Sequence, residues 1–259
     1  MNRKFVDFSI KPKNIFEAEK MIEKASFLNY KYIGIVLNKE INKENFSKIK
    51  EYSLKNGIDA FTKIELEAYN KKEILNFLRK NRRNFEIISI MCRTKEAALL
   101  ASRDGRVDTY IISLKNDLII DKGVASISKN TIEIQAKEII NYGKDLFKII
   151  KNLMKILEIS KSYNIPLIFS SGAENIYEQR SPIILKSFLT AFEYPEEEAL
   201  KSISDIPLNK LMENRLKLSN EIVMPGVRIV KNKKIGLKPL KNHNLFSFRN
   251  SKKLNSYMY

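Results

Sequence analysis

Short apolar runs alternate along most of the chain with longer segments in which apolar residues recur every three or four positions. Runs of about four to eight residues that are rich in β-branched and aromatic side chains are typical of buried strands. Such runs predict strands over residues 5–10, 32–37, 58–64, 85–91, 107–113, 131–135 and 166–170. The run 131–135 is a weak example, whereas 166–170 is a stronger one.

The longer segments have the period of amphipathic helices. They predict helices over residues 14–30, 42–56, 71–81, 94–103, 141–163, 182–193, 196–203 and 207–219. The clearest is 141–163, whose apolar face carries Leu146, Ile149, Ile150, Leu153, Ile156 and Leu157. Lysines of the same segment fall on the other face, where we expect them to be solvated.

Strand and helix alternate throughout, which indicates parallel strands joined by crossover helices. Such a sheet is either open and doubly wound or closed into a barrel. The barrel is favoured because the number of units matches its strand count, and because the dinucleotide pattern G-x-G-x-x-G of open sheets is absent. We therefore predict an α/β fold: an irregular TIM-like barrel over residues 1–221, followed by a basic C-terminal tail over residues 222–259.

The chain carries 47 Lys and Arg against 30 Asp and Glu, a formal net charge of +17. A surplus of this size predicts a polyanionic partner, nucleic acid first and an anionic membrane surface second. Residues 222–259 contain nine Lys or Arg and no Asp or Glu, so +8 of the charge remains on residues 1–221. The tail is either a solvated, flexible appendage or an extension that binds RNA, and both interpretations stay open.

The single cysteine, Cys92, cannot form an internal disulfide, and its place at the end of an apolar run predicts a buried, unreactive thiol. A reducing compartment inside the cell fits this usage. The first residues lack the continuous apolar stretch of a secretion signal, and no later run approaches the ~18 apolar residues that span a bilayer. We expect a soluble, cytoplasmic protein with no membrane-spanning segment.

Hydrolytic centres need side chains that this chain hardly has. A His-rich metal site is excluded, and a Ser-His-Asp triad is unfavourable, because the only histidine is His243 in the basic tail. An all-carboxylate Mg²⁺ site built from Asp7, Asp59, Asp108 and Glu133 remains open. Asp59 and Asp108 begin predicted strands, however, at the end opposite to the usual active-site face of a barrel, where caps and turn residues are more typical.

The polar residues that follow the predicted strands are mainly basic or hydroxylic: Ser9, Lys11, Asn38, Lys39, Cys92, Arg93, Ser113, Lys115, Lys122, Ser170, Ser171 and Arg180. Lys and Arg side chains beside a helix N-terminus hold phosphates without cleaving them. Arg180 is the sharpest example, because Ser181 and Pro182 after it predict a helix cap and a first-turn proline. The competing interpretation is a surface Arg bonded to the preceding loop.

Four motifs follow one another along the chain: "FVDFSI", "RDGRVD" leading into "TYIIS", "SSGAENIYEQRSP" and "YPEEEALKSISDIPLNKLMENR". In this order, over residues 1 to about 218, the chain resembles the family of archaeal ribonuclease P protein component 3, relatives of the thirty-kilodalton eukaryotic subunit. The resemblance implies an irregular barrel similar to phosphoesterases of the polymerase and histidinol phosphatase type (PHP-like). Where those enzymes carry an H-x-H run, this chain reads Val6-Asp7-Phe8.

The resemblance implies a role in removing the 5′ leader of precursor tRNA, with the catalytic centre and its Mg²⁺ in the RNA and no cofactor or catalytic residue in this chain. The implied partners are ribonuclease P RNA, precursor tRNA, other ribonuclease P proteins and a small subunit of RNA-recognition-like fold, in a two-plus-two heterotetramer. The implied RNA contacts are Arg93, Arg106, Lys122, Ser170, Ser171 and Arg180. Arg106 has the alternative of pairing with a nearby carboxylate at a strand entrance.

Two functions of other classes compete with this one. The first is a free-standing phosphoesterase or nuclease barrel that uses Asp or Glu with Mg²⁺, and the second is membrane-surface binding through residues 222–259. Neither the histidine count nor the strand-end residues favour the nuclease. We therefore expect the chain to hold RNA rather than to cut it.

Overall fold

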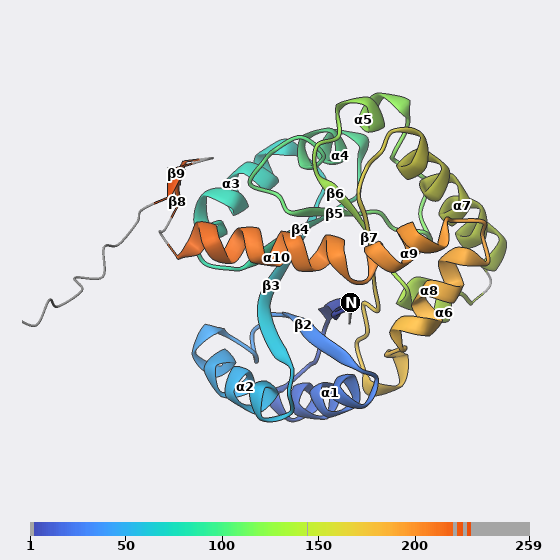
Figure 1. The fold of residues 1–259 in the computed structure, drawn as a ribbon. Coiled ribbons are helices and arrows are strands. Elements are labelled where there is room, and N and C mark those ends of the chain that lie inside the picture. Colours follow the sequence, from blue (N-terminus) through green and yellow to red (C-terminus); the bar gives the residue numbers. More distant parts are fainter. Residues whose placement is uncertain (1–2, 144, 220–221, 225–226, 229–259) are drawn as a thin grey trace, which may run out of the picture.

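A computed structural model describes residues 3–143, 145–219, 222–224 and 227–228 of the protein. Seven parallel strands form one sheet in the order β1 to β7, with helices around it (Figure 1). The strands are β1 (Phe5–Ile10), β2 (Tyr30–Val36), β3 (Asp59–Ala68), β4 (Ile87–Cys92), β5 (Thr109–Ile111), β6 (Thr131–Gln135) and β7 (Leu167–Ser170). Each strand pairs in parallel with the next, as the alternation of strands and helices predicted.

The helices connect and cover these strands. They are α1 (Ile15–Phe27), α2 (Lys43–Lys55), α3 (Lys71–Asn81), α4 (Lys95–Ala101), α5 (Lys122–Ile127), α6 (Lys137–Ile140), α7 (Leu146–Ser162), α8 (Pro182–Thr190), α9 (Glu196–Ser202) and α10 (Asp205–Leu218), with a 3₁₀ turn η1 (Ile176–Glu178). Side-chain caps fix several starts: Asn14, Asn42, Asn70 and Thr94 each accept a hydrogen bond from the backbone N–H three residues on. Such caps satisfy N–H groups that have no partner inside the helix.

The sheet curls into a nearly closed barrel, so the predicted TIM-like fold is confirmed. Its two end strands meet just beyond β7, where Ile10 and Ala173 form a parallel bridge. The Lys11 N–H donates to the Ala173 carbonyl there at 2.7 Å. Nearer the start of β1, the Val6 N–H donates instead to the carbonyl of Ile203, in the turn between α9 and α10. This turn occupies part of the gap between β1 and β7, which makes the barrel irregular.

Helix α10 lies across the amino-terminal ends of the strands (Figure 1). Its Leu211 is fully buried in a cluster with Val6, Phe8, Phe61, Ile87 and Ile168. Its Arg215 forms ion pairs with Asp59 and Glu86, each at 2.6 Å. We call this closed end of the barrel the floor, and the end at the carboxyl termini of the strands the mouth.

Packing inside the barrel requires glycine at one position of β2. A Cβ on Gly34 would lie 2.3 Å from the Phe8 carbonyl oxygen and 2.7 Å from the Phe61 ring. The two phenylalanine rings are themselves in contact, with centroids 5.6 Å apart. Gly34 therefore lets β1 and the aromatic pair approach β2 more closely than any other residue would.

The structure differs from the prediction mainly in short elements. α5 and α6 are absent from the predicted set because six and four residues are too few to display a helical period. The helix predicted over 141–163 begins only at Leu146, after Gly143, whose φ of 60° interrupts a right-handed helix. The helix predicted over 207–219 begins earlier, at Asp205, because Pro207 is tolerated in a first turn.

Little of the predicted tail belongs to the described residues. The strands β8 (Ile222–Met224) and β9 (Val227–Arg228) pair antiparallel at its start. Its remaining residues, including His243, lie outside the described part of the chain, so the tail's role and the domain boundary at residue 221 stay predictions. Within the described part, no helix combines the length and apolar character needed to cross a bilayer.

Candidate functional site

A buried ion pair crosses the inside of the barrel. The Lys63 ammonium on β3 lies 2.5 Å from Glu133 Oε1 on β6 and 3.2 Å from Glu65 Oε1. Lys63 and Glu133 have no exposed side-chain surface. Because β4 and β5 separate β3 from β6 in the sheet, this contact passes through the interior. The centre of the barrel is thus occupied by a cation of the protein itself.

Hydroxyl groups complete the surroundings of Glu133. Ser170 Oγ donates to Oε1 at 3.1 Å, while Thr109 Oγ1 and Ser89 Oγ lie 2.7 and 3.2 Å from Oε2. The Ser89 and Thr109 hydroxyls are also 2.6 Å apart, so one of them donates to the other. With Lys63, polar groups from four strands surround this carboxylate, and its charge is neutralised inside the protein.

A second ion pair lies closer to the mouth. Lys11 Nζ is 2.6 Å from Glu65 Oε2, and its side chain is 18% exposed. Burial by itself would raise the pKa of Glu65, but the charges of Lys63 and Lys11 hold it well below its usual range. Gln135 joins the same group, since its amide donates to Glu65 at 3.0 Å and its oxygen accepts from Lys11 at 3.1 Å. The mouth is therefore lined by paired charges.

Asp7 on β1 is buried and bonds to the loop after β7. Ser171 donates to it twice, through its Oγ at 2.6 Å and its backbone N–H at 3.1 Å. Burial raises the pKa of Asp7 to about 6, although these hydrogen bonds favour the carboxylate and oppose the rise. Asp7 therefore connects β1 to the loop after β7 where the barrel closes, although burial of its carboxylate is unfavourable.

Replacing Asp7 by Asn should change how stability depends on pH. A folded pKa above the ordinary 3.8 means that this group's contribution is fully present below pH 3.8 and is lost as pH rises through about 6. Asn does not titrate, so Asp7→Asn should gain about 2 kcal/mol relative to the wild type between pH 4 and pH 7. Urea unfolding at several pH values measures this, and a difference that is constant with pH would contradict it.

The carboxylates considered for Mg²⁺ do not converge. Asp59 and Asp108 lie near the floor, as predicted, and both are held by cations: Asp59 by Lys50 and Arg215, Asp108 by Arg82 at 2.7 Å. Asp7 and Glu133 bond inside the barrel to different partners. Among the residues that the structure describes, no group of three or more His, Cys, Asp or Glu side chains is placed to hold a metal ion.

Two of the predicted strand-end cations at the mouth, Arg93 and Lys11, are paired with carboxylates. Arg93 donates to Glu67 at 2.8 Å, which raises the pKa of the guanidinium further. Lys11 is paired with Glu65, as described above. Lys122 is exposed at the first position of α5 and has no carboxylate within 4 Å among the described residues. As RNA contacts, Arg93 and Lys122 stay predictions.

Arg180 lies in the loop that caps α8. Ser181 accepts from the Ile184 N–H at 3.4 Å and Pro182 opens the helix, so the predicted cap is confirmed. The Arg180 guanidinium donates to the carbonyls of Tyr177 at 2.5 Å and Gln179 at 3.1 Å. The side chain thus braces the preceding loop, which is the arrangement of the competing interpretation, while contact with RNA stays untested.

The remaining candidates lie in other places. Ser170 and Ser171 are fully buried on Glu133 and Asp7, so a phosphate would reach these hydroxyls only after those bonds broke. Arg106 lies toward the floor and pairs with both oxygens of Asp104, at 3.0 and 2.7 Å, as its alternative predicted. The six candidates therefore do not form one site. Cys92 is buried as predicted, and burial raises the pKa of its thiol to about 12.

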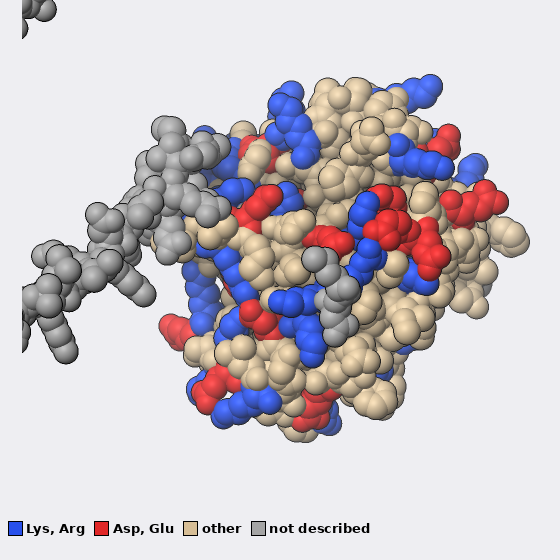
Figure 2. All heavy atoms as spheres, in the orientation of Figure 1, with Lys and Arg blue, Asp and Glu red and all other residues tan. Residues whose placement is uncertain are grey.

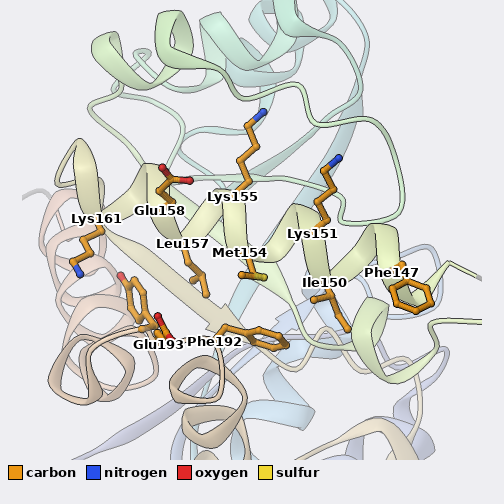
Figure 3. Close-up of a pocket in the computed structure, with 11 residues that line it drawn as sticks. Phe147, Ile150, Lys151, Met154, Lys155, Leu157, Glu158, Lys161, Phe192 and Glu193 are labelled. Atoms are coloured by element: carbon orange, nitrogen blue, oxygen red, sulfur yellow. The ribbon is translucent and has the colours of Figure 1, made fainter.

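A groove between α7 and the link from α8 to α9 was not indicated by the sequence (Figure 3). It encloses about 770 Å³, and Phe147 and Met154 on its α7 side are 89% and 53% exposed. Charged side chains of both signs also line it: Lys151, Lys155, Lys161, Glu158 and Glu193. Exposed apolar area within mixed charge suits a protein surface better than phosphate.

Comparison with known proteins identifies relatives over most of the chain. A profile of the family described as RNase P subunit p30 matches residues 4–219. Ribonuclease P protein component 3 of Methanococcus maripaludis is 23% identical over 222 residues, which cover 76% of this chain and 87% of the relative. The protein of the same name from Methanocaldococcus jannaschii is 22% identical over 229 residues, which cover 80% and 89%.

Solved structures share the fold. A chain in a cryo-EM structure of archaeal ribonuclease P with mature tRNA superimposes with a TM-score of 0.75 at 19% identity, covering 88% of this chain and 99% of that one. An amidohydrolase crystal structure reaches a TM-score of 0.51 at 11% identity, covering 85% and 75%. The family profile spans all the strands of the barrel and helix α10, and on this ground the chain belongs to the RNase P subunit p30 family.

Proposed function

We propose that this chain is a non-catalytic protein subunit of ribonuclease P that helps the RNA of that enzyme to act. The holoenzyme is the endoribonuclease of tRNA 5′ maturation, and the chain shares in that activity as one of its parts. Its relatives carry the name of a ribonuclease P protein component, and one structure with this fold comes from archaeal ribonuclease P with mature tRNA.

The observation that carries the non-catalytic part of the proposal is the Lys63–Glu133 ion pair at 2.5 Å inside the barrel. A hydrolytic barrel needs free carboxylates or imidazoles at this position to activate water. Here the carboxylate is paired with one ammonium and lies among three hydroxyls, and the histidine-free strands supply no alternative base. In the proposal the Mg²⁺ that leader removal requires is bound by the RNA, and this chain binds no cofactor.

The physical role we propose is to neutralise RNA phosphates. A net charge of +17 lowers the repulsion between RNA helices that must pack together, so the RNA folds and binds Mg²⁺ at lower salt. The gain in cleavage rate is indirect under this mechanism. It should therefore be largest at low Mg²⁺ and disappear at salt concentrations where the RNA folds alone.

The proposed partners are ribonuclease P RNA, precursor tRNA within the holoenzyme, other ribonuclease P proteins and a small subunit of RNA-recognition-like fold. A two-plus-two heterotetramer of the chain with that small subunit is part of the proposal. The groove beside Phe147 and Met154 supports a protein partner, because large apolar side chains left in water are typical of interfaces. The mass of the purified pair, by light scattering, tests the stoichiometry.

Reconstitution tests the function directly. Ribonuclease P RNA from the same organism should cleave precursor tRNA at least about tenfold faster with the full chain and its small partner than without them, at low millimolar Mg²⁺; a gain of that size corresponds to about 1.4 kcal/mol. The chain alone should not cleave. Cleavage by the RNA-free chain, lost on Asp7→Asn, would instead support the free-standing nuclease.

A further inference from the structure

Cations gather near the floor of the barrel, around the end of α3, the turn from α4 to β5 and the start of β6. They are Arg79, Lys80, Arg82, Arg83, Arg103, Arg106 and Lys129, and we call them the floor patch. Only two carboxylates, Asp104 and Asp108, lie in the same three stretches of chain. Lys and Arg side chains are seen over α3 and α4 on the face that carries α10 (Figure 2).

Specific bonds hold these three stretches together. Arg82 donates to Asp108 at 2.7 Å, which ties the end of α3 to the start of β5. The Asn130 side chain donates to the carbonyls of Ala101 at 2.7 Å and Asp104 at 2.8 Å, which ties the entrance of β6 to the end of α4. Arg103 and Lys129 consequently line one shallow hollow of about 540 Å³. The patch is therefore built on a fixed framework.

Most cations of the floor patch have no carboxylate partner among the residues that the structure describes. Arg82 and Arg106 are taken by the two carboxylates. Within the patch, the exposed cations with no carboxylate within 4 Å among the described residues are Arg79, Lys80, Arg83, Arg103 and Lys129. At the mouth, Lys11, Arg93, Lys95 and Lys137 are paired, whereas Lys39 and Lys122 are exposed and have no such partner. Free cations can exchange their counterions for phosphates without first breaking an ion pair.

The composition of the patch favours RNA over a membrane. Five of its seven cations are arginines, whose planar guanidinium donates two parallel hydrogen bonds to a phosphate. A membrane-binding surface also needs exposed apolar side chains to enter the bilayer. None of the exposed large hydrophobic residues in the described part of the chain belongs to these three stretches.

Helix α10, which precedes the basic tail in the sequence, contacts the patch. In the C-terminal half of α10, Asn214 accepts a hydrogen bond from Arg82 of the patch at 3.0 Å. The nine cations of residues 222–259 follow this helix in the sequence.

We propose that the floor patch is a surface with which this chain holds the sugar-phosphate backbone of folded RNA. The inference rests on the proposed function and adds the location. It reverses the usual orientation of a TIM-like barrel, whose ligands bind at the carboxyl ends of the strands. Three contacts to phosphate should contribute about 2 to 3 to the slope of log Kd against log salt.

The test replaces Arg83, Arg103 and Lys129 by Ala in the full chain, with a control in which Lys13, Lys20 and Lys31 are replaced by Ala. All three control lysines are exposed, and their replacement removes the same charge, but Lys13 precedes α1, Lys20 lies on α1 and Lys31 is the second residue of β2, outside the patch. Binding to fluorescently labelled ribonuclease P RNA is followed by anisotropy from 50 to 300 mM KCl. The patch variant should bind at least about tenfold more weakly with a flatter salt slope, and the control should stay near wild type.

Reconstituted cleavage distinguishes a wrong location of the RNA-binding surface from a wrong proposed function. If the wild type accelerates cleavage and the patch variant matches it in affinity, slope and rate, the location is wrong and the proposed function stands. If the wild type neither binds RNA nor accelerates cleavage, the function itself fails. Stronger binding of the patch to vesicles of phosphatidylserine and phosphatidylcholine than to RNA would also overturn the inference. If the triple variant unfolds at a lower temperature than the wild type, the test is repeated with a double variant, Arg79→Glu with Lys80→Glu, at exposed positions of α3.

Discussion

Lys63→Met should lower the free energy of unfolding by about 3–5 kcal/mol, because it leaves the buried carboxylate of Glu133 without its cation. Methionine has a similar length and cannot donate a hydrogen bond, so the change removes charge with little change in volume. The three hydroxyls around Glu133 remain, but they do not compensate a full charge in a dry interior. Urea unfolding at neutral pH measures the loss.

A double-mutant cycle assigns the effect to the pair. Glu133→Gln alone should also be destabilising, while Lys63→Met with Glu133→Gln should be clearly more stable than the sum of the single losses predicts. Lys31→Met, at an exposed position of β2, should change stability by no more than about 0.5 kcal/mol. Simple additivity of the two buried substitutions would show that Lys63 and Glu133 do not depend on each other.

Leu211→Ala should destabilise the protein by about 2–5 kcal/mol, because it opens a cavity between α10 and the inside of the barrel. Leu211 is fully buried, and its neighbours come from β1, β3, β4 and β7. Strands already fixed by their hydrogen bonds cannot collapse to fill the space. Thermal and urea unfolding should both move toward earlier transitions.

The same helix offers a matched control. Leu216 is partly exposed and lies outside the Leu211 cluster, so Leu216→Ala should lose less than half as much stability. An equal loss from both substitutions would mean that α10 contributes through its helical propensity and not by closing the floor. Because the Asn214 contact to Arg82 of the floor patch depends on α10, RNA binding by Leu211→Ala should also fall.

The mouth of this barrel illustrates why a pattern of cations is not yet a binding surface. Arg93 and Lys11 follow strands, where barrels usually bind ligands, and the sequence singled them out for that reason. In the structure each meets a carboxylate of β3, Glu67 or Glu65. The sequence did not single out residues 79–83, because only the fold ties the end of α3 to the start of β5 through Arg82 and Asp108 and brings Arg103 and Lys129 to one hollow.

The order of strands and helices could be predicted from the sequence by itself, because local side-chain periodicity and caps such as Ser181 fix these elements within a few residues. The single histidine and the excess of Lys and Arg likewise restricted the chemistry before any fold was known. Only the tertiary structure showed that Lys63 and Glu133, 70 residues apart, neutralise each other. Pairing between distant residues depends on strand register and barrel closure, which no local pattern encodes, so only the tertiary structure showed which cations have a carboxylate partner and which do not.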